Sequence, residues 1–373
     1  MLGKRKLILD KSCEVYDLLL PWMDGDFFDF GQHHVVPGAV YLIDRAQMNH
    51  NRELIRELIE SDTIRVILSN PAEGSSTLKD HCEHIHNCGD LARDHRMLLI
   101  GGGDMDSEWP CLQYDSFLPK ILDYKENQQA TSQSSRIYET LHKPYKFLFL
   151  NGRSRFHRKY LLERFRLNGL LDQSLWTNLE KQTVQQQGQD PMFTSIDIMT
   201  LPAKYEVERY RQQVNKTFDS GFVKSDLFSR EWGEIYIEPA PYIDTYFSLV
   251  TETVFDYPYS FRTEKIWKPM AMAHPWIAVA NAGYYRDIRN LGFKTFDHLI
   301  DESFDQIEDS QKRIERIAEV VTDLCGQNLD EFLASAQNIC KYNQQHLADM
   351  RLQVRKEFPE RFFQFIARYQ FNE

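Results

Sequence analysis

The sequence predicts an α/β fold in two domains, followed by a helical C-terminus. In the first part of the chain, short apolar runs rich in strand formers alternate with helical patterns, which favours a parallel sheet. A second series of strands and helices begins near residue 145, and 373 residues are enough for two domains of ordinary size. We therefore expect an N-terminal α/β domain over residues 1–140, a second α/β domain over 141–345, and a C-terminal helix over 346–373.

The first domain is expected to contain four short strands and at least one helix. The helix covers residues 51–61, where apolar residues recur on one face. The glycine run 101–103 follows the last strand and predicts a tight turn, although three glycines also permit close approach of the backbone to a ligand. Small polar residues over 127–135 predict a loop or linker. The expected strands are 6–9, 40–43, 64–68 and 97–100.

The stretch from residue 246 to 305 organises the second domain. Residues 247–251 alternate apolar and polar side chains, which predicts a strand. After an aromatic loop, residues 264–273 have helical spacing, and the Thr263 hydroxyl can cap that helix. A proline then ends the helix before a buried strand over 276–280, which leads through a glycine turn into another helix.

Charged residues follow the first strand of this stretch and start its first helix. Ligands bind at the carboxyl ends of strands in open α/β sheets, and a helix N-terminus favours an anion. Arg262 and Lys265 are therefore candidates to bind a phosphate, together with Thr263. Glu252 and Glu264 are candidates to accept hydrogen bonds from sugar hydroxyls. The alternative is an ordinary strand–helix–strand unit with a capped helix and a surface Glu–Lys pair.

We expect the strand predicted at 145–150 to run parallel to the strand at 276–280. A second basic run follows the strand at 145–150. A glycine turn and a helix ending at Gly169 come next, which is typical of a phosphate site. Positive charge at a helix N-terminus costs free energy, so an anionic partner is favoured there. The alternative is a solvated basic helix start. The candidate phosphate ligands are Asn151, Arg153, Arg155 and Arg158.

The stretch resembles the donor-binding half of α1,3-fucosyltransferases and related bacterial and viral glycosyltransferase-like proteins of the GT-B class. These carry a glutamate, then a Tyr/Phe-x-Thr-Glu-Lys run, then a small residue and proline before an apolar strand. The matching residues are Glu252, residues 261–265 and residues 273–279. The related proteins continue with segments similar to 292–296 and 300–305, and open their second domain with a similar Asn-x-Arg-x-Arg-x-x-Arg run.

The resemblance implies two Rossmann-like domains in a GT-B-like arrangement, with a last helix that crosses back to the first domain. It implies transfer of a sugar from a nucleotide-sugar donor, GDP-linked donors being one option, to an unidentified acceptor hydroxyl. The chain departs from fucosyltransferases at Arg262 and His274 and lacks a recognisable acceptor-domain signature, so the sugar stays open. Two alternatives of other classes are a non-catalytic nucleotide- or sugar-binding module and an interaction protein that uses its aromatic surface.

A base must take the proton of the acceptor hydroxyl, and the sequence does not single one out. Two Asp-x-Asp matches, at 24–26 and 104–106, follow no convincing nucleotide-binding unit, so we expect a metal-independent reaction without a cofactor. The His/Cys-rich segment 81–88 matches none of the usual zinc spacings. The weak candidates for the base are Asp24, Asp26, Asp29, His33, His34 and Asp104.

Composition narrows the partners further. A net charge of −11 argues against general affinity for nucleic acid. No apolar run is long enough for a transmembrane segment, and charged residues interrupt the N-terminal apolar stretch, so we expect neither a membrane span nor a signal peptide. Six dispersed cysteines do not form a disulfide framework. We therefore expect a cytoplasmic protein.

Overall fold

The computed structural model describes residues 7–10, 13–22, 27–28, 39–44, 65–70, 97–103, 110–151, 155–178 and 236–368. These residues belong to two compact units, which are described separately. The first unit takes those within Met1–Pro119, Tyr257–Phe261 and Met350–Glu373. The second takes those within Lys120–Asp256 and Arg262–Asp349. Residues 120–140 therefore pack with the second unit.

The first unit is built on a six-stranded parallel sheet in the order β2-β1-β3-β4-β5-β6. The apolar runs predicted as strands form strands here, because their Val, Ile and Leu side chains fill the core. The helix expected over 51–61 lies outside the described residues. The strands are β1 (Leu7–Asp10), β2 (Phe27–Phe28), β3 (Val40–Asp44), β4 (Arg65–Asn70), β5 (Met97–Gly101) and β6 (Cys111–Gln113).

Gly103, at the end of the glycine run, is needed because two stretches of backbone approach closely. Its φ is +82°, and a Cβ atom there would lie 2.5 Å from the Ser260 carbonyl oxygen. Ser260 belongs to the Tyr257–Phe261 segment, which packs with the first unit. At Gly103 the glycine run thus permits close approach of the chain's own backbone.

The second unit contains a four-stranded parallel sheet in the order β10-β9-β7-β8. β7 (Tyr145–Asn151) and β10 (Trp276–Val279) each pair in parallel with β9 (Thr245–Thr251), which confirms the prediction that they run in the same direction. β8 (Leu175–Asn178) pairs with β7. All seven residues of β9 are buried, as a central parallel strand requires.

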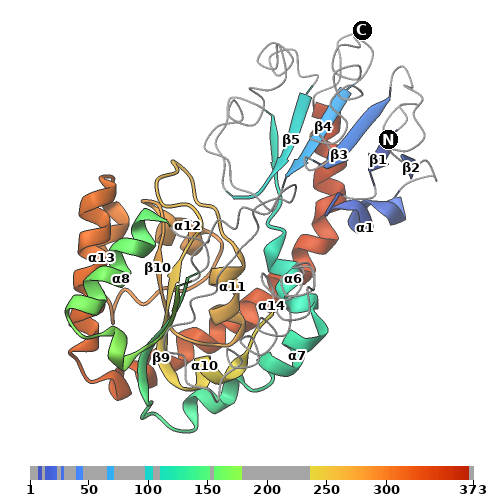
Figure 1. The fold of residues 1–373 in the computed structure, drawn as a ribbon. Coiled ribbons are helices and arrows are strands. Elements are labelled where there is room, and N and C mark those ends of the chain that lie inside the picture. The colour runs from blue at the N-terminus through green and yellow to red at the C-terminus, as the bar shows by residue number, and fades with distance from the viewer. Residues whose placement is uncertain are drawn as a thin grey trace, which may run out of the picture. The chain divides into compact units, whose positions relative to one another are not determined.

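Helices cover both faces of this sheet (Figure 1). α8 (Phe156–Leu167) and α13 (Ser310–Cys325) lie on one side, where Phe165 packs on Phe147 and Phe149. α11 (Glu264–Ala271) lies on the other side. The remaining helices of the unit include α7 (Lys125–Thr131), α10 (Pro239–Ile243), α12 (Tyr284–Asn290) and the first part of α14 (Leu329–Arg368).

The linker predicted over 127–135 is wrong, because this stretch is largely helical. It forms α7 and the 3-10 helix η2 (Ser134–Tyr138). Asn127 is fully buried, where its Oδ1 accepts from the Ile237 N–H at 2.7 Å and its Nδ2 donates to the Ile121 carbonyl at 2.9 Å. This helix is therefore packed through a buried polar side chain with hydrogen-bond partners, and it lacks the apolar sequence pattern by which a packed helix is normally predicted.

The C-terminal helix begins earlier than residue 346, because α14 runs without a break from Leu329 to Arg368. In the structure Asn343 is buried and bridges the N–H and the carbonyl of Lys294 at 2.9 and 2.8 Å. Past Pro359, the aromatic side chains of Phe362 and Phe365 pack into the core of the first unit.

Candidate functional site

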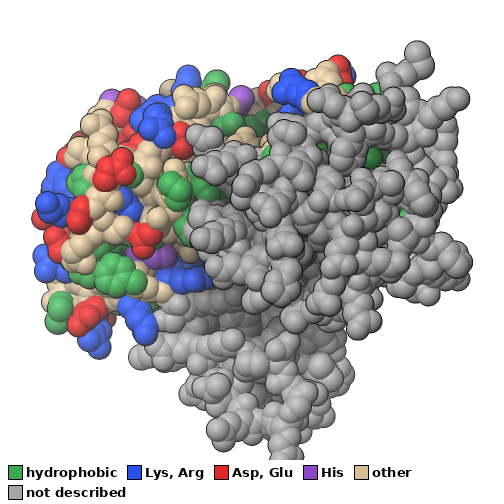
Figure 2. All heavy atoms as spheres, turned by 90° about the horizontal axis from the view of Figure 1, so that it is seen from above, with side chains coloured by type: hydrophobic (Ala, Val, Ile, Leu, Met, Phe, Trp, Pro, Cys, Tyr) green, Lys and Arg blue, Asp and Glu red, His purple; other side chains and the backbone are tan. Residues whose placement is uncertain are grey.

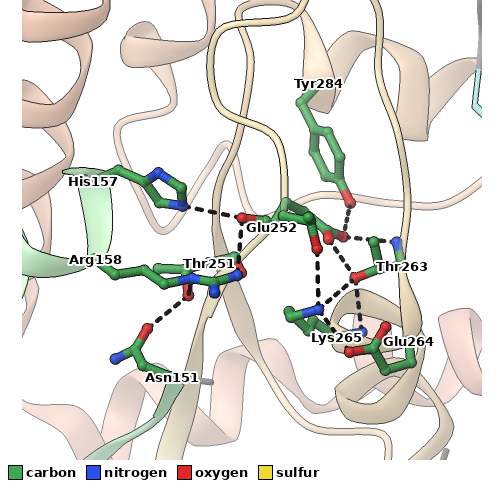
Figure 3. A network of polar contacts seen from close by, with 10 residues as sticks. Asn151, His157, Arg158, Thr251, Glu252, Thr263, Glu264, Lys265 and Tyr284 are labelled. Atoms are coloured by element: carbon green, nitrogen blue, oxygen red, sulfur yellow. Dashed lines mark hydrogen bonds and ion pairs between the residues drawn. The ribbon is translucent and has the colours of Figure 1, made fainter. Parts of the chain in front are cut away.

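The carboxyl ends of β7 and β9 lie side by side in the second unit and bring together the predicted site residues of two distant segments. Thr251, at the end of β9, donates its hydroxyl to the Asn151 Oδ1 at 2.9 Å. Figure 3 shows Glu252 between two groups of side chains. One comes from β7 and α8 (Asn151, His157, Arg158), and the other from the start of α11 (Thr263, Glu264, Lys265).

Arg158 reaches the end of β9 from the first turn of α8. Its Nε donates to the Thr251 hydroxyl at 3.2 Å, and one terminal nitrogen donates to the carbonyls of Thr251 and Glu252 at 3.0 and 3.2 Å. The side chain is buried, so these contacts hold the chain where β9 ends. Arg155 precedes α8 and is exposed, whereas Arg153 lies outside the described residues.

His157 is a site residue that the sequence did not single out. Its Nε2 lies 3.0 Å from the Glu252 carbonyl, and its ring stacks on Phe255 with centroids 5.0 Å apart. Burial lowers the pKa of His157 to about 3, helped by the charge of Arg158. The neutral imidazole therefore donates from Nε2 to the carbonyl. No spacing or motif marks this role, which depends on the fold bringing α8 onto the loop after β9.

The Glu252 carboxylate is buried and accepts three hydrogen bonds. Oε1 accepts from the Thr263 N–H at 3.2 Å and from the Tyr284 hydroxyl at 2.8 Å. Oε2 accepts from the Thr263 hydroxyl at 2.6 Å. Burial raises the pKa of Glu252 above its ordinary value, although the charge of Lys265 and the Thr263 hydrogen bond oppose the shift. The carboxylate thus joins the end of β9 to the starts of α11 and α12.

The start of α11 carries the cation of the site. Thr263 is the N-cap and its hydroxyl accepts from the Lys265 N–H, which confirms the predicted cap. The Lys265 Nζ lies 2.6 Å from the Glu264 carboxylate, 3.2 Å from the Thr263 hydroxyl and 3.3 Å from the Thr253 hydroxyl. Burial favours a higher pKa for Glu264, but the charges of Lys265 and Lys268 outweigh it and hold that pKa below its ordinary value.

The residues of this hydrogen-bond network differ in their exposure to solvent. The side chain of Lys265 is 24% exposed and that of Glu264 is 12% exposed, so both reach solvent. Glu252 has no exposed surface, and Arg262 is buried. Lys265 and Glu264 are therefore the members of the network that an incoming ligand can reach most directly.

Residues 281–283, the glycine turn predicted after the strand at 276–280, lead into α12. Asn281 is buried and its side-chain amide donates to the Ala282 carbonyl at 2.8 Å. Gly283 is the N-cap, with a φ of +79°. Asp305, from the 300–305 segment, accepts from the backbone N–H groups of Tyr285 and Arg286 at 2.9 and 3.1 Å. Asp305 thus caps α12 from outside the helix.

All six candidates for the catalytic base belong to parts of the sequence that the structure does not describe. Asp24, Asp26, Asp29, His33, His34 and Asp104 lie outside the described residues, as do both Asp-x-Asp matches and the His/Cys segment 81–88. Within the described ranges, no group of three His, Cys, Asp or Glu side chains is arranged to hold a metal ion. No helix among those described combines the length and the hydropathy needed to cross a membrane.

Charge on the described surface is mixed. Figure 2 shows basic and acidic side chains interspersed over the part of this face that the structure describes. The described part of this face therefore carries no broad positive field.

Comparison with known proteins adds no family to this description. Searches against protein-family models, curated proteins and solved structures found no match to this chain.

Proposed function

We propose that the protein is a glycosyltransferase that moves a sugar from a nucleotide-sugar donor to an acceptor hydroxyl. The observation that carries the proposal is the position of Lys265, a partly exposed cation at the first turn of α11, next to the carboxyl end of β9. Parallel α/β sheets bind ligands at this edge, and a helix N-terminus adds favourable backbone N–H groups for an anion. The motif resemblance around residues 261–265 supports the same assignment.

The chemistry of transfer explains why a cation is needed there. A nucleotide sugar loses a nucleoside diphosphate, and the negative charge that develops on it must be stabilised. Lys265 supplies that charge, and the exposed Arg155, just before α8, supplies a second cation at the same edge of the sheet. Glu264 accepts a hydrogen bond from a sugar or ribose hydroxyl. Arg158 has a supporting role through its contacts with Thr251.

The GT-B arrangement is part of the proposal. In it, the second unit is the donor domain, and the acceptor and the catalytic base belong to the first unit. Because helix starts and basic side chains carry the charge, transfer proceeds without a divalent metal.

Nucleotide binding by the full chain is the decisive test. We expect GDP, UDP, ADP or CDP to raise the melting temperature, since a ligand at 100 times its Kd stabilises the folded state by about 2.7 kcal/mol. Lys265→Met should weaken that binding about tenfold or more, because a hydrogen bond to a charged group contributes about 1.5–3 kcal/mol. Lys294→Met is the matched control, since Lys294 packs over the Tyr342 ring and should not affect the affinity.

Further measurements distinguish the proposed glycosyltransferase from the alternative functions. Undiminished binding and sugar transfer in excess EDTA is expected, whereas complete loss that manganese restores would contradict metal independence. Nucleotide binding without turnover of any nucleotide sugar would favour a non-catalytic binding module. If no nucleoside diphosphate changes the melting temperature, the glycosyltransferase proposal is wrong and an interaction protein becomes the better hypothesis.

A further inference from the structure

We propose that Glu252 and Tyr284 are positioning residues, which orient the Thr263 hydroxyl and through it the ammonium group of Lys265. This inference rests on the proposed function for the role of Lys265 in ligand binding. It assigns Glu252 a different task from the hydroxyl acceptor that the sequence suggested, and it adds Tyr284, which the sequence did not single out.

The argument begins with burial. Glu252 has no exposed surface, and its two carboxylate oxygens accept three hydrogen bonds from within the protein. A ligand hydroxyl would have to displace Thr263 or Tyr284 to reach it. Glu264 pairs with Lys265 at 2.6 Å, but 12% of its side chain is exposed, so it keeps the role of hydroxyl acceptor.

The direction of each hydrogen bond follows from the donor and acceptor inventory. An ionised carboxylate only accepts, so the Thr263 hydroxyl must donate its one proton to Glu252 at 2.6 Å. Its lone pairs then face the two donors of Lys265, the backbone N–H at 3.4 Å and the Nζ at 3.2 Å. Glu252 thus fixes the direction of the Thr263 hydroxyl, and the hydroxyl presents its lone pairs to Lys265.

Tyr284 forms the other end of this series of hydrogen bonds. Its hydroxyl donates to the same oxygen, Oε1, that accepts the Thr263 N–H. Because Tyr284 opens α12 and Thr263 precedes α11, Glu252 ties the starts of two helices to the end of β9. A shift of the carboxylate would therefore move the first turn of α11, and with it Lys265.

The experiment compares Glu252→Gln and Tyr284→Phe with Tyr285→Phe. Glutamine keeps the shape of Glu252 but adds an N–H₂ group, which can donate to the Thr263 hydroxyl and take a lone pair from Lys265. Tyr284→Phe removes one donor. Tyr285→Phe is the matched control, because Tyr285 is adjacent and buried. Its hydroxyl accepts from the Ala278 N–H at 2.7 Å, whereas the Glu252 carboxylate accepts from Thr263 and Tyr284.

The first readout needs no ligand. The rate at which an amine reagent acylates Lys265 is measured by mass spectrometry of its peptide at one pH under native conditions. We expect Glu252→Gln and Tyr284→Phe to raise that rate about fivefold, the change that corresponds to loss of one ordinary hydrogen bond. Tyr285→Phe should leave the rate at the wild-type value. Equal rates in all four proteins would overturn the proposal.

The second readout is a double-mutant cycle on nucleoside diphosphate affinity. If Tyr284 acts through Lys265, Tyr284→Phe weakens binding in the wild-type background and has no effect in the Lys265→Met background. An effect of the same size in both backgrounds would show that Tyr284 acts by another route and would overturn the proposal. If the wild-type protein binds no nucleotide, the proposed function fails, and the acylation rates alone decide the positioning role.

Discussion

The guanidinium group of Arg313 lies 4.4 Å from the ring centroid of Phe255 and donates to the carbonyl of the same residue at 2.6 Å. Arg313 also donates to the carbonyls of Ala280, Ile307 and Glu308. Since its side chain is buried, one residue of α13 satisfies the backbone acceptors of three loops at the carboxyl edge of the second sheet. The Phe255 ring also stacks on the His157 ring.

Arg313→Met is therefore expected to destabilise the second unit strongly. The substitution keeps most of the apolar volume but leaves four carbonyls without this donor, and those of Phe255 and Ala280 belong to buried residues. Each hydrogen bond from a charged group contributes about 1.5–3 kcal/mol. We expect the free energy of unfolding in urea to fall by about 3–5 kcal/mol. Arg316→Met, one turn along α13, removes two surface ion pairs with Asp301 and Glu319 and should cost less than about 1 kcal/mol. Equal losses in the two variants would contradict this assignment.

Gly292 follows α12 at a φ of +90°, where a Cβ atom would lie 2.8 Å from the His346 Nε2. That nitrogen lies 2.7 Å from the Leu291 carbonyl, so a methyl group would break a hydrogen bond as well as strain the backbone. We expect Gly292→Ala to cost about 2–4 kcal/mol of unfolding free energy. Gly169→Ala is the control for backbone strain alone, because Gly169 has a φ of +74° and nothing within 4 Å of the added carbon. Its expected cost is about 1 kcal/mol.

Asp305 is expected to matter for stability rather than for ligand binding. Its carboxylate accepts the Tyr285 and Arg286 N–H groups, which have no partner within the first turn of α12. Asp305→Ala should therefore lower the unfolding free energy by about 1–2 kcal/mol, the usual cost of a lost cap. Asp297→Ala, at a carboxylate whose side chain is 69% exposed and lies 3.5 Å from His298, should cost less than about 1 kcal/mol. A loss of nucleotide affinity in Asp305→Ala, without a change in stability, would instead place this residue in the ligand site.

Local features of the sequence predicted strands in both units. Apolar runs of strand length, bounded by Gly and Pro, predicted β7, β9 and β10 and their common direction, and Thr263 marked the start of α11. These features are local, since a cap and a buried strand depend on a few neighbouring residues. The site residues found this way, Glu252 and Lys265, both contact Thr263 in the structure.

Long-range hydrogen bonds account for what the sequence did not predict. His157 and Arg313 act on backbone carbonyls far away in the chain, and no residue type or spacing marks a carbonyl acceptor. Asn127 and Asn343 are buried because they too bond distant backbone groups, and the polarity around Asn127 made a helical segment resemble a linker. The charges of Glu252 and Arg158 suggested that both contact a ligand. In the structure both side chains are buried and form hydrogen bonds with the protein's own backbone.

Stability should fall in mild acid because of two buried histidines. His274 has Nδ1 2.9 Å from the Ser248 hydroxyl and Nε2 3.0 Å from the Thr245 carbonyl. Burial lowers the pKa of His274 to about 3, and the pKa of His157 is lowered to about 3 as well. The unfolded chain binds these protons near the ordinary value of about 6.5. Between these values the unfolded state holds more protons, so the contribution to stability is complete above about pH 6.5 and is lost as the pH falls toward 3.

The slope of unfolding free energy against pH tests this prediction. Each histidine contributes up to about 1.4 kcal/mol per pH unit to the slope. His274→Gln should therefore reduce the slope between pH 5 and 6 by about that amount, even if the substitution also changes the unfolding free energy at every pH. His298→Gln is the control, because the His298 side chain is 57% exposed and should leave the slope unchanged. Burial raises the pKa of Glu252, Glu302 and Asp305, which act in the opposite direction, but they are common to all three proteins and cancel in the difference. A His274→Gln slope equal to that of the wild type, from urea unfolding at each pH, would show that His274 is not held neutral in the folded protein.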